Sequence, residues 1–472
     1  MLEKHILSKL LNRLGFEPTS GQRVLFERLA EYIVSFTDSR IFLINGYAGT
    51  GKTSALGALV NVLKELGQRV VLLAPTGRAA KVLASYAHTP AFTIHKKIYR
   101  QRSLSEELSH FALDRNLHRD TLFVVDEASM VANSPSPSAM FGSGMLLDDL
   151  VSYVRSGVRC RLMLVGDKAQ LPPVGFSVSP ALDPSTLAVY GETIRIELTE
   201  VVRQASQSGI LTNATLIRNN IDYGVLQLPS FELSGFPDII QINGTDVQET
   251  IENAYMQYGE DNVTVICRSN VRTNNYNNGI RATVLGRDEE LTSGDRLMVV
   301  KNHYGAFGTD AEPIDFIANG DTAEVVRIRG YEERYGLRYA NVLLRLPDYN
   351  DVEIESKLIL DTLSLETPSL SNEQNKALFF AVNEDYSHIT EKRKRYKAVR
   401  EDPYFNALQV KYAYALTCHK AQGGQWKAVM LDQLFFKEAI QPDDLRWLYT
   451  AFTRASERLY LVNFEKKKSG KG

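Results

Sequence analysis

The sequence predicts an α/β protein with two parallel sheets covered by helices and a β-rich insertion in the second half. Short apolar runs, each followed by a turn and an amphipathic stretch, recur in the first and the last parts of the chain. This alternation is typical of parallel sheets with helices on both faces. From about residue 285 to 350, short alternating strands broken by glycines favour a small antiparallel module.

The individual elements follow from apolar runs rich in Val, Leu and Ile. The strands expected in the first sheet lie at 41–44, 70–74, 121–125 and 161–165. The strands expected in the second sheet lie at 263–267, 412–416, 429–431 and 459–462. The first 16 residues predict a short amphipathic helix, and the charged stretch at 386–402 predicts a helix or arm lying in solvent. A Ser- and Pro-rich patch at 133–144 is expected to be a loop.

Length and composition set the broad class. At roughly 150 residues per domain, a chain of 472 residues predicts about three domains. Its 44% hydrophobic and 23% charged residues exclude a disordered tail, a collagen-like repeat and a disulfide-stapled miniprotein. The formal net charge is only -2. Overall charge therefore does not indicate a nucleic-acid-binding protein, although one basic groove could exist on a chain of balanced charge.

The cysteines and the apolar segments indicate the compartment. Cys160, Cys267 and Cys418 lie far apart and have no metal-ligand spacing, which favours a reducing environment. The first residues carry charges among their apolar positions, unlike a signal peptide, and no stretch approaches 18 apolar residues. We therefore expect a soluble cytoplasmic protein that does not enter a membrane.

The strongest chemical signal is GYAGTGKT at residues 46–53, which satisfies the P-loop pattern between an apolar strand and a helical segment. Gly46, Gly49 and Gly51 would let backbone N–H groups approach phosphate oxygens. Lys52 would then reach the β- and γ-phosphates, and the hydroxyl of Thr53 would ligate Mg²⁺. A glycine turn without a ligand is the alternative, and the complete motif in this context argues against it.

A second signal is the acidic pair at the end of the strand in LFVVDEAS. Asp126 would hold Mg²⁺, and Glu127 would lie near an attacking water. Taken alone, such a pair is more often a helix N-cap. A P-loop about 70 residues upstream favours the metal-binding interpretation, so the two motifs together predict a nucleoside triphosphatase that uses Mg²⁺.

Further blocks carry a family resemblance. They include APTGRAA, TIHK, VGDKAQLPPVG, LTEVVRQ, TCHKAQG and YTAFTRA, with PTSGQRVLF near the start of the chain. With the P-loop and VVDEAS, these blocks stand in the order of the superfamily 1 helicase motifs. The chain resembles the B branch, which includes the RecD-like and Dda-like DNA helicases, from about residue 15 to 465. Seven or more ordered motifs make a chance agreement negligible.

The resemblance implies roles at the nucleotide site. Gln170 is expected to sense the γ-phosphate, and Arg203 and Arg454 to act as arginine fingers beside Lys52, Asp126 and Glu127. Gln22 is the expected adenine contact. The residues expected to bind ATP are Gln22, Gly46, Ala48, Gly49, Thr50, Gly51, Lys52, Thr53, Ser54 and Gly423, and those expected to hold Mg²⁺ are Thr53 and Asp126.

The resemblance also implies contacts with single-stranded DNA, mostly to the backbone, which carries no sequence information. The residues expected to make them are Pro75, Thr76, Arg78, Thr93, His95, Thr417, His419 and Lys420. Relatives have a strand-separating hairpin where this chain has the short segment 97–120. Phe111 is the one aromatic residue near its centre, and is therefore our candidate for a wedge. The basic cluster at 392–400 could contact DNA or could be a solvated face.

The family implies two RecA-like P-loop domains, with a small pin insertion and a β-rich SH3-like insertion. The first domain would comprise 1–95 and 121–205, interrupted by the pin at 96–120; the second would comprise 206–284 and 409–472, interrupted by 285–408. The expected activity is ATP-dependent DNA unwinding, 5′ to 3′ by resemblance, by a monomer acting on single strands and junctions in replication, repair or recombination. A translocase that displaces proteins, or a DNA-binding scaffold with a vestigial ATPase, are the alternatives.

Overall fold

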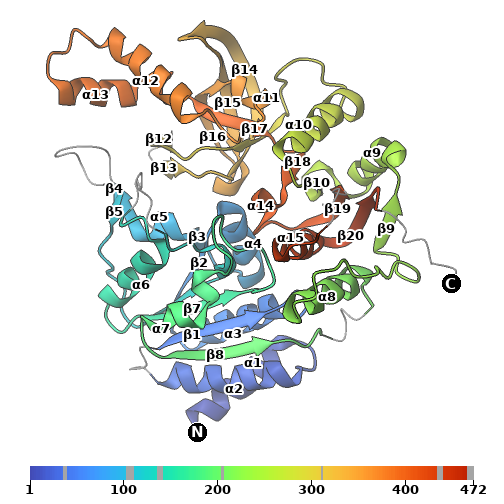
Figure 1. Ribbon diagram of the computed structural model, residues 1–472. Coiled ribbons are helices and arrows are strands. Elements are labelled where there is room, and N and C mark those ends of the chain that lie inside the picture. Colours follow the sequence, from blue (N-terminus) through green and yellow to red (C-terminus); the bar gives the residue numbers. More distant parts are fainter. Residues whose placement is uncertain are drawn as a thin grey trace.

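The computed structural model describes residues 1–35, 40–101, 111–134, 142–202, 207–309, 312–432 and 439–464. Within them the chain forms two parallel sheets, a closed five-stranded barrel and two short hairpins. The first sheet lies near the N-terminus, the second beside it, and the barrel at the far end of the molecule (Figure 1). The predicted fold class of helix-flanked parallel sheets with a β-rich insertion is confirmed.

The first sheet has the order β3-β2-β6-β7-β1-β8, and every neighbouring pair is parallel. Its strands are β1 (Ile41–Gly46), β2 (Arg69–Ala74), β3 (Ala91–Thr93), β6 (Thr121–Val125), β7 (Arg161–Gly166) and β8 (Thr193–Leu198). The four strands predicted for it are confirmed. The two edge strands β3 and β8 were not predicted, because they are short or half-exposed and lack a continuous apolar run.

Helices cover this sheet on both faces. Phe42 and Ile44 of β1 pack with one group of helices, whereas Ile41 and Leu43 pack with the other. The first group is α1 (Leu2–Leu14), α2 (Ser20–Val34), α3 (Lys52–Glu65) and α4 (Gly77–Ala87). The second group is α5 (Ile94–Ile98), α6 (Leu146–Ser156) and α7 (Pro184–Ala188). Burial on both faces explains why the central strands β1, β2, β6 and β7 are mostly apolar.

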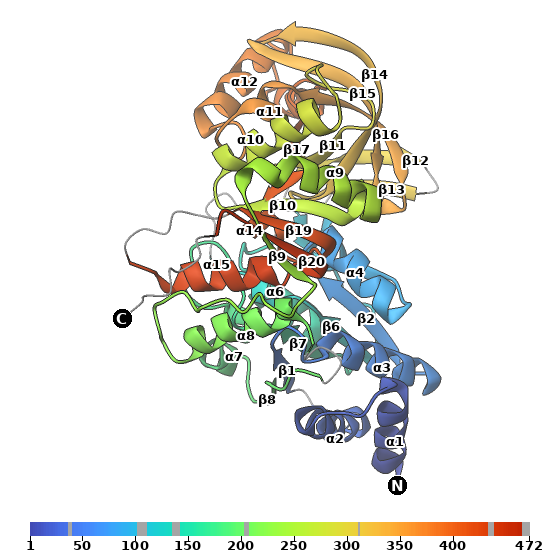
Figure 2. The ribbon, with the colours of Figure 1, turned by 90° about the vertical axis from the view of Figure 1, so that its right-hand side faces the viewer.

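The second sheet has the order β18-β10-β19-β20-β9, also with parallel pairs throughout. Its strands are β9 (Ile239–Ile242), β10 (Val263–Cys267), β18 (Ala415–Thr417), β19 (Trp426–Asp432) and β20 (Ala455–Val462). Its helices are α8 (Gly209–Asp222), α9 (Val247–Tyr258), α10 (Asn270–Gly279), α14 (Cys418–Ala421) and α15 (Pro442–Phe452). Figure 2 shows this sheet between the first sheet and the barrel.

The barrel is formed by β11, β14, β15, β16 and β17. These strands are β11 (Arg296–Val299), β14 (Thr322–Arg334), β15 (Leu337–Leu346), β16 (Val352–Ile359) and β17 (Leu408–Tyr412). The expected β-module is present, but it closes only through β17. The single strand predicted at 412–416 is therefore wrong: Tyr412 pairs with Leu297 in the barrel, whereas Ala415 pairs with Val265 in the second sheet. One apolar run serves two sheets, so composition alone does not mark the break.

The remaining elements are two hairpins and three helices around the barrel. The hairpins are β4 (Tyr99–Gln101) with β5 (Phe111–Leu113), and β12 (His303–Thr309) with β13 (Glu312–Ile317). The helices are α11 (Asp361–Ser364), α12 (Asn372–Asp385) and α13 (Lys392–Glu401). The predicted charged helix is confirmed in α13. In the part of the chain that the structure describes, no helix is both long and apolar enough to cross a membrane.

Candidate functional site

The P-loop connects β1 to α3 at the carboxyl edge of the first sheet. Gly49 and Gly51 have φ of 74° and 78°, a backbone conformation that favours glycine. A Cβ atom at Gly51 would lie 2.4 Å from Nε2 of Gln22, so this position also needs glycine for space. The Lys52 ammonium donates hydrogen bonds to the carbonyls of Gly46 and Tyr47. The loop therefore has its cation at the position where a phosphate-binding P-loop requires one.

The acidic pair lies at the carboxyl end of β6, in the same first sheet as the P-loop strand. The Glu127 N–H donates to Oδ1 of Asp126 over 2.8 Å. Glu127 has a left-handed backbone with φ 52°, which costs a non-glycine residue free energy and orients its side chain away from a regular strand. Burial, and then the neighbouring Glu127 charge, raise the pKa of Asp126 to about 7. A half-buried carboxylate with so little compensating positive charge is suited to a cation.

A third acidic residue, Asp167, follows β7 and is 1% exposed. Its Oδ2 lies 3.9 Å from the Lys52 ammonium. Burial raises the pKa of Asp167, while Lys52 and a hydrogen bond from Tyr449 act in the opposite direction. Three residues later, Gln170 is 5% exposed, and its Oε1 has no hydrogen-bond partner among the described residues. A buried amide left unsatisfied in this way is suited to a bound polar group.

Tyr449 of α15 connects the second sheet's helix to the P-loop of the first. Its hydroxyl accepts a hydrogen bond from the Ala48 N–H over 2.8 Å and donates one to Oδ2 of Asp167 over 2.7 Å. At the next residue, the Thr450 hydroxyl accepts a hydrogen bond from the Leu171 N–H. Asp167 and Tyr449 are not among the residues predicted from the sequence. Asp167 stands in the quoted block VGDKAQ and could have been singled out, whereas no local signal marks Tyr449.

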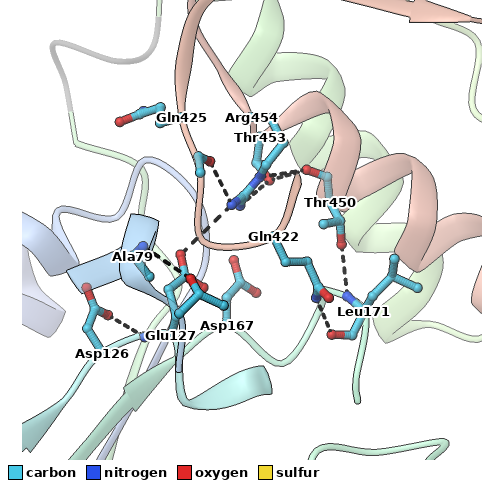
Figure 3. A network of polar contacts seen from close by, with 12 residues as sticks. Ala79, Asp126, Glu127, Asp167, Leu171, Gln422, Gln425, Thr450, Thr453 and Arg454 are labelled. Carbon is cyan, nitrogen blue, oxygen red and sulfur yellow. Dashed lines mark hydrogen bonds and ion pairs between the residues drawn. The ribbon is translucent and has the colours of Figure 1, made fainter. Parts of the chain in front are cut away.

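Arg454 comes from the second sheet's side and points at Glu127 (Figure 3). Its Nη1 lies 4.0 Å from Oε1 of Glu127. The guanidinium is held in place by hydrogen bonds to the carbonyls of Thr450 and Gly424. Lys52, Glu127 and Arg454 thus meet at one site although they lie far apart in the sequence. The other predicted arginine finger, Arg203, lies outside the described residues.

The other residues predicted to bind ATP surround this site. Gln22 is fully buried; its amide donates to the Thr50 carbonyl, and its oxygen accepts from the Thr19 N–H. It therefore buttresses the P-loop here, while adenine contact stays a prediction. Thr53 is half-buried and Ser54 exposed at the start of α3. A Cβ at Gly423 would lie 3.1 Å from the Thr76 hydroxyl oxygen, so a glycine brings the second sheet's loop close to α4.

The oxygen ligands predicted for Mg²⁺ fit that ion. Thr53 offers a hydroxyl and Asp126 a carboxylate, the ligand types that Mg²⁺ prefers beside nucleotide phosphates. Asp126 is held by its bond from the Glu127 backbone, and its raised pKa reflects a carboxylate in need of positive charge.

Three of the predicted DNA contacts are threonines that immediately precede helices at strand ends. Thr76 follows β2 and accepts a hydrogen bond from the Ala79 N–H at the start of α4. Thr93 ends β3 and accepts from the Lys96 N–H, and Thr417 ends β18. Pro75 stands next to Thr76. Because strand ends of both sheets are represented, these residues line the edges of two domains rather than one.

The basic residues predicted to contact DNA are partly covered by protein. The Arg78 guanidinium lies 4.5 Å from the ring centroid of Trp426, and burial lowers its pKa. Burial lowers the pKa of His95 to about 4 and that of Lys420 to about 8. His419 is exposed, and desolvation by its neighbours lowers its pKa. His95 is therefore neutral at pH 7. Its ring could form a hydrogen bond with DNA or stack on a base, but it carries no positive charge.

The candidate wedge residue Phe111 lies in β5, paired with Gln101 of β4. This hairpin occupies the position where a short pin was expected. Phe111 is 5% exposed, and its ring lies 6.5 Å from that of Phe316. The side chain thus packs at the base of the hairpin, whose residues 102–110 lie outside the described part of the chain. A wedge role for Phe111 stays a prediction.

The hydroxyl of Tyr449 can be tested by Tyr449→Phe, which leaves the ring in place. The change removes one partner each from the Ala48 N–H and Asp167, at a cost of about 1–3 kcal/mol. We expect kcat/KM for ATP to fall by about tenfold, since the P-loop and α15 are no longer joined. Tyr32→Phe is the matched control, because its buried hydroxyl bonds to the Arg40 carbonyl. Equal kinetics in the two variants would contradict the expectation.

Comparison with known proteins gives similarities along most of the chain. A family model described as an AAA domain matches residues 21–227, and one described as a UvrD-like helicase C-terminal domain matches residues 412–462. The ATP-dependent RecD2 DNA helicase of Deinococcus radiodurans is 29% identical over 202 residues, which is 42% of this chain and 24% of that protein. The ATP-dependent DNA helicase dda of Enterobacteria phage T4 is 25% identical over 403 residues, covering 80% of this chain and 84% of the phage protein.

The extent of these matches differs among relatives. The chain spans about a quarter of the RecD2 helicase and 38% of a Methanocaldococcus jannaschii protein that is 22% identical over 487 residues. Among solved structures, a Pif1 helicase from Bacteroides in complex with ADP-AlF3 and single-stranded DNA has a TM-score of 0.47 and 16% identity, covering 95% of this chain and 93% of that one.

Proposed function

We propose that this chain is a helicase of the RecD-like and Dda-like B branch of superfamily 1, and that it uses ATP hydrolysis to move along single-stranded DNA and separate duplex. The observation that supports this most directly is the approach of Arg454 to Glu127. A hydrolytic site assembled from two domains opens and closes as its nucleotide changes. Opening and closing is the motion that a translocating motor needs.

The proposed hydrolytic roles follow from the positions of the side chains. Lys52 leaves the carbonyls of Gly46 and Tyr47 for the β- and γ-phosphates, and Glu127 orients the attacking water. Thr53 and Asp126 hold Mg²⁺, which neutralises phosphate charge when bound. Arg454 stabilises the charge that develops on the transferring phosphoryl group. Gln170, with its unsatisfied amide oxygen, supports a role in sensing that group.

Tyr449 and Thr450 give the proposed motor a mechanical connection. Both belong to α15, and they bond to Ala48 and Leu171 on the other domain. A change in the P-loop when the γ-phosphate leaves is therefore transmitted directly to α15. Since α15 packs in the core of the second sheet, the two domains move relative to each other.

Single-stranded DNA is the proposed track, lying across the strand ends that carry Thr76, Thr93 and Thr417. A groove of about 500 Å³ lies between α4, α5 and the barrel, and its lining includes Thr93, Lys96 and Tyr349. The Lys96 ammonium lies 5.5 Å from the ring centroid of Tyr349. Cations and aromatic rings in one groove are typical of sequence-tolerant binding to single strands. The polarity of 5′ to 3′ and the predicted domain boundaries are parts of this proposal, except that the inserted domain ends at 412 and not at 408, because β17 closes the barrel.

The test is the rate of ATP hydrolysis with and without single-stranded DNA. We expect the oligonucleotide to raise kcat by tenfold or about that order, because DNA binding across both domains favours the closed site. Thr93→Ala should raise the DNA concentration needed for half-maximal stimulation. Thr186→Ala serves as the control and should not change this concentration. It removes a hydroxyl of α7 that donates a hydrogen bond to Asp183, the residue just before that helix. Hydrolysis that is indifferent to DNA would overturn the proposal, and stimulation without separation of a tailed duplex would limit it to translocation.

A further inference from the structure

The helix α13 is the most strongly charged element of a chain whose formal net charge is only -2. Six of its ten residues are Lys or Arg, and one is acidic. Lys392, Arg393, Tyr396 and Lys397 fall on one side of the helix, since residues three and four apart are neighbours on a helix surface. Val399, beside Tyr396 on the helix surface, is buried, and Arg395 and Ala398 are half-buried. The helix thus has a buried edge next to a basic one.

Exposed aromatic rings lie next to this basic edge. Phe380 of α12 is 63% exposed and Tyr396 is 46% exposed. Both rings pack against Phe379, with centroid distances of 5.8 Å and 5.6 Å. Phe379 is itself partly buried against Phe405. Two large rings are therefore held in place on a half-buried ring while remaining accessible to solvent, and together they form an exposed apolar patch beside basic residues.

The pair of helices is firmly attached to the barrel. Leu378, Val382 and Val399 share a buried cluster with Tyr339 of β15. Asp385 at the end of α12 accepts hydrogen bonds from Arg334 and Tyr335 at the tip of β14. A surface that is positioned by this much buried contact is a fixed feature of the fold. The surface of α12 and α13 is therefore held in a defined position and is suited to binding a ligand.

We propose that Phe380, Lys392, Arg393, Tyr396 and Lys397, together called the α12–α13 face, bind single-stranded DNA at a second site outside the track. Lysines and arginines meet phosphates, and the rings stack on bases, a combination typical of single-strand binding. Bases in a duplex are already stacked, so exposed rings favour a single strand over double-stranded DNA. The acidic partners of Lys394 and Lys397 are exposed, so exchanging these pairs for phosphates costs little.

The position of the face indicates which strand it takes. Figures 1 and 2 show α12 at the outer end of the barrel, apart from the strand ends proposed as the track. A strand running along the track does not reach it. Given the proposed function, unwinding produces a second single strand at the fork, and the α12–α13 face is where this displaced strand is held. Holding it would slow its return to the duplex behind the motor.

The experiment compares two forked substrates that differ in one tail. Both have a loading tail of single-stranded DNA; the second tail is either DNA of about 12–16 nucleotides or a polyethylene glycol spacer of similar length. We expect the wild-type protein to bind the fork with the DNA second tail about tenfold more tightly. Phe380→Ala/Tyr396→Ala should abolish this preference. Lys392→Ala/Lys397→Ala should also reduce it, and should lower the slope of log affinity against log salt by about 1.4, at about 0.7 per lost phosphate contact.

Matched controls change the same residue types elsewhere. Lys4→Ala/Lys427→Ala removes two other exposed lysines, and Tyr223→Ala/Tyr331→Ala removes two other exposed rings. Both control pairs should keep the wild-type preference. ATPase stimulation by an unforked oligonucleotide is measured on the same preparations. If that stimulation is absent, the proposed function fails whatever the forks show.

Three results would overturn the second site while leaving the motor intact. The first is that single-stranded DNA stimulates ATP hydrolysis but the wild-type protein binds the two forks with equal affinity. The second is a preference that survives in both α12–α13 double variants. The third is equal affinity for forks with a single-stranded and a double-stranded second tail, where this affinity falls in the lysine variant but not in the variant that lacks the two rings. That last result would assign the face to duplex phosphates instead.

Discussion

Lys52→Ala is expected to lower kcat for ATP by about three orders of magnitude or more. The Lys52 ammonium lies within 3.9 Å of Asp167 and bonds to the P-loop carbonyls of Gly46 and Tyr47, so it is already confined to the loop that cradles phosphates. Removing it leaves the developing phosphoryl charge without its nearest cation, and a comparable electrostatic contact contributes several kcal/mol to a transition state. Steady-state ATP hydrolysis with saturating single-stranded DNA measures the effect.

Lys64→Ala on the same helix is the matched control for Lys52→Ala. Lys64 lies in the last turn of α3, at the end away from the P-loop, and its ammonium donates a hydrogen bond to the His88 carbonyl at the end of α4. The control should retain wild-type kcat, and single-strand affinity should be largely kept in both variants. Wild-type turnover by the Lys52 variant would show that the nucleotide site has been assigned to the wrong loop.

Arg454→Ala is expected to reduce kcat by about 10³- to 10⁵-fold while ATP still binds. Its guanidinium is 4% exposed and reaches to 4.0 Å from Glu127 across the boundary between the two parallel sheets. A charge delivered from the second domain acts on the transition state, whereas the P-loop on the first domain supplies most ground-state binding. Single-turnover hydrolysis and nucleotide binding, measured separately, distinguish these two contributions.

Arg458→Ala controls for loss of an arginine from the same segment. Arg458 lies in β20 and donates to the Pro237 carbonyl. Because Arg454 also bonds to the Thr450 and Gly424 carbonyls, the midpoint of thermal unfolding should be compared for both variants. If Arg454→Ala lost ATP binding and hydrolysis in equal proportion, its role would be to hold the two domains together and not to stabilise transferring charge.

Local patterns predict the parts of this structure that depend on local chemistry. Runs such as Thr121–Val125 and Val263–Cys267 are strands with the predicted bounds, because burial on both faces favours a nearly continuous run of apolar and β-branched residues. The P-loop is equally legible, since Gly49 and Gly51 occupy conformations that favour glycine. The edge strand Thr193–Leu198 is half-exposed and carries no such signature.

Contacts between distant segments are where the sequence falls short. The bond from Tyr449 to Asp167 joins residues 282 positions apart, and a tyrosine in a helix looks the same whether it packs, bonds or catalyses. The break between Tyr412 and Ala415 is hidden for a related reason: both neighbouring sheets require apolar residues, so the run does not change where the chain passes from one to the other. Position in the fold, rather than composition, decides these roles.

The closure of the barrel by β11 and β17 has a consequence for how the chain is divided. These two strands are hydrogen-bonded neighbours, with Leu297 opposite Tyr412 and the Val300 N–H bonded to the Gln409 carbonyl. The polypeptide therefore leaves the second sheet through β11 and returns to it through β17, at two points that lie next to each other. The segment from β11 to β17 is therefore an inserted module, which we call the cassette, and its two ends are as close together as the two ends of a tight turn. Such a cassette can be lengthened, shortened or exchanged without disturbing the order of strands in the sheet that carries it.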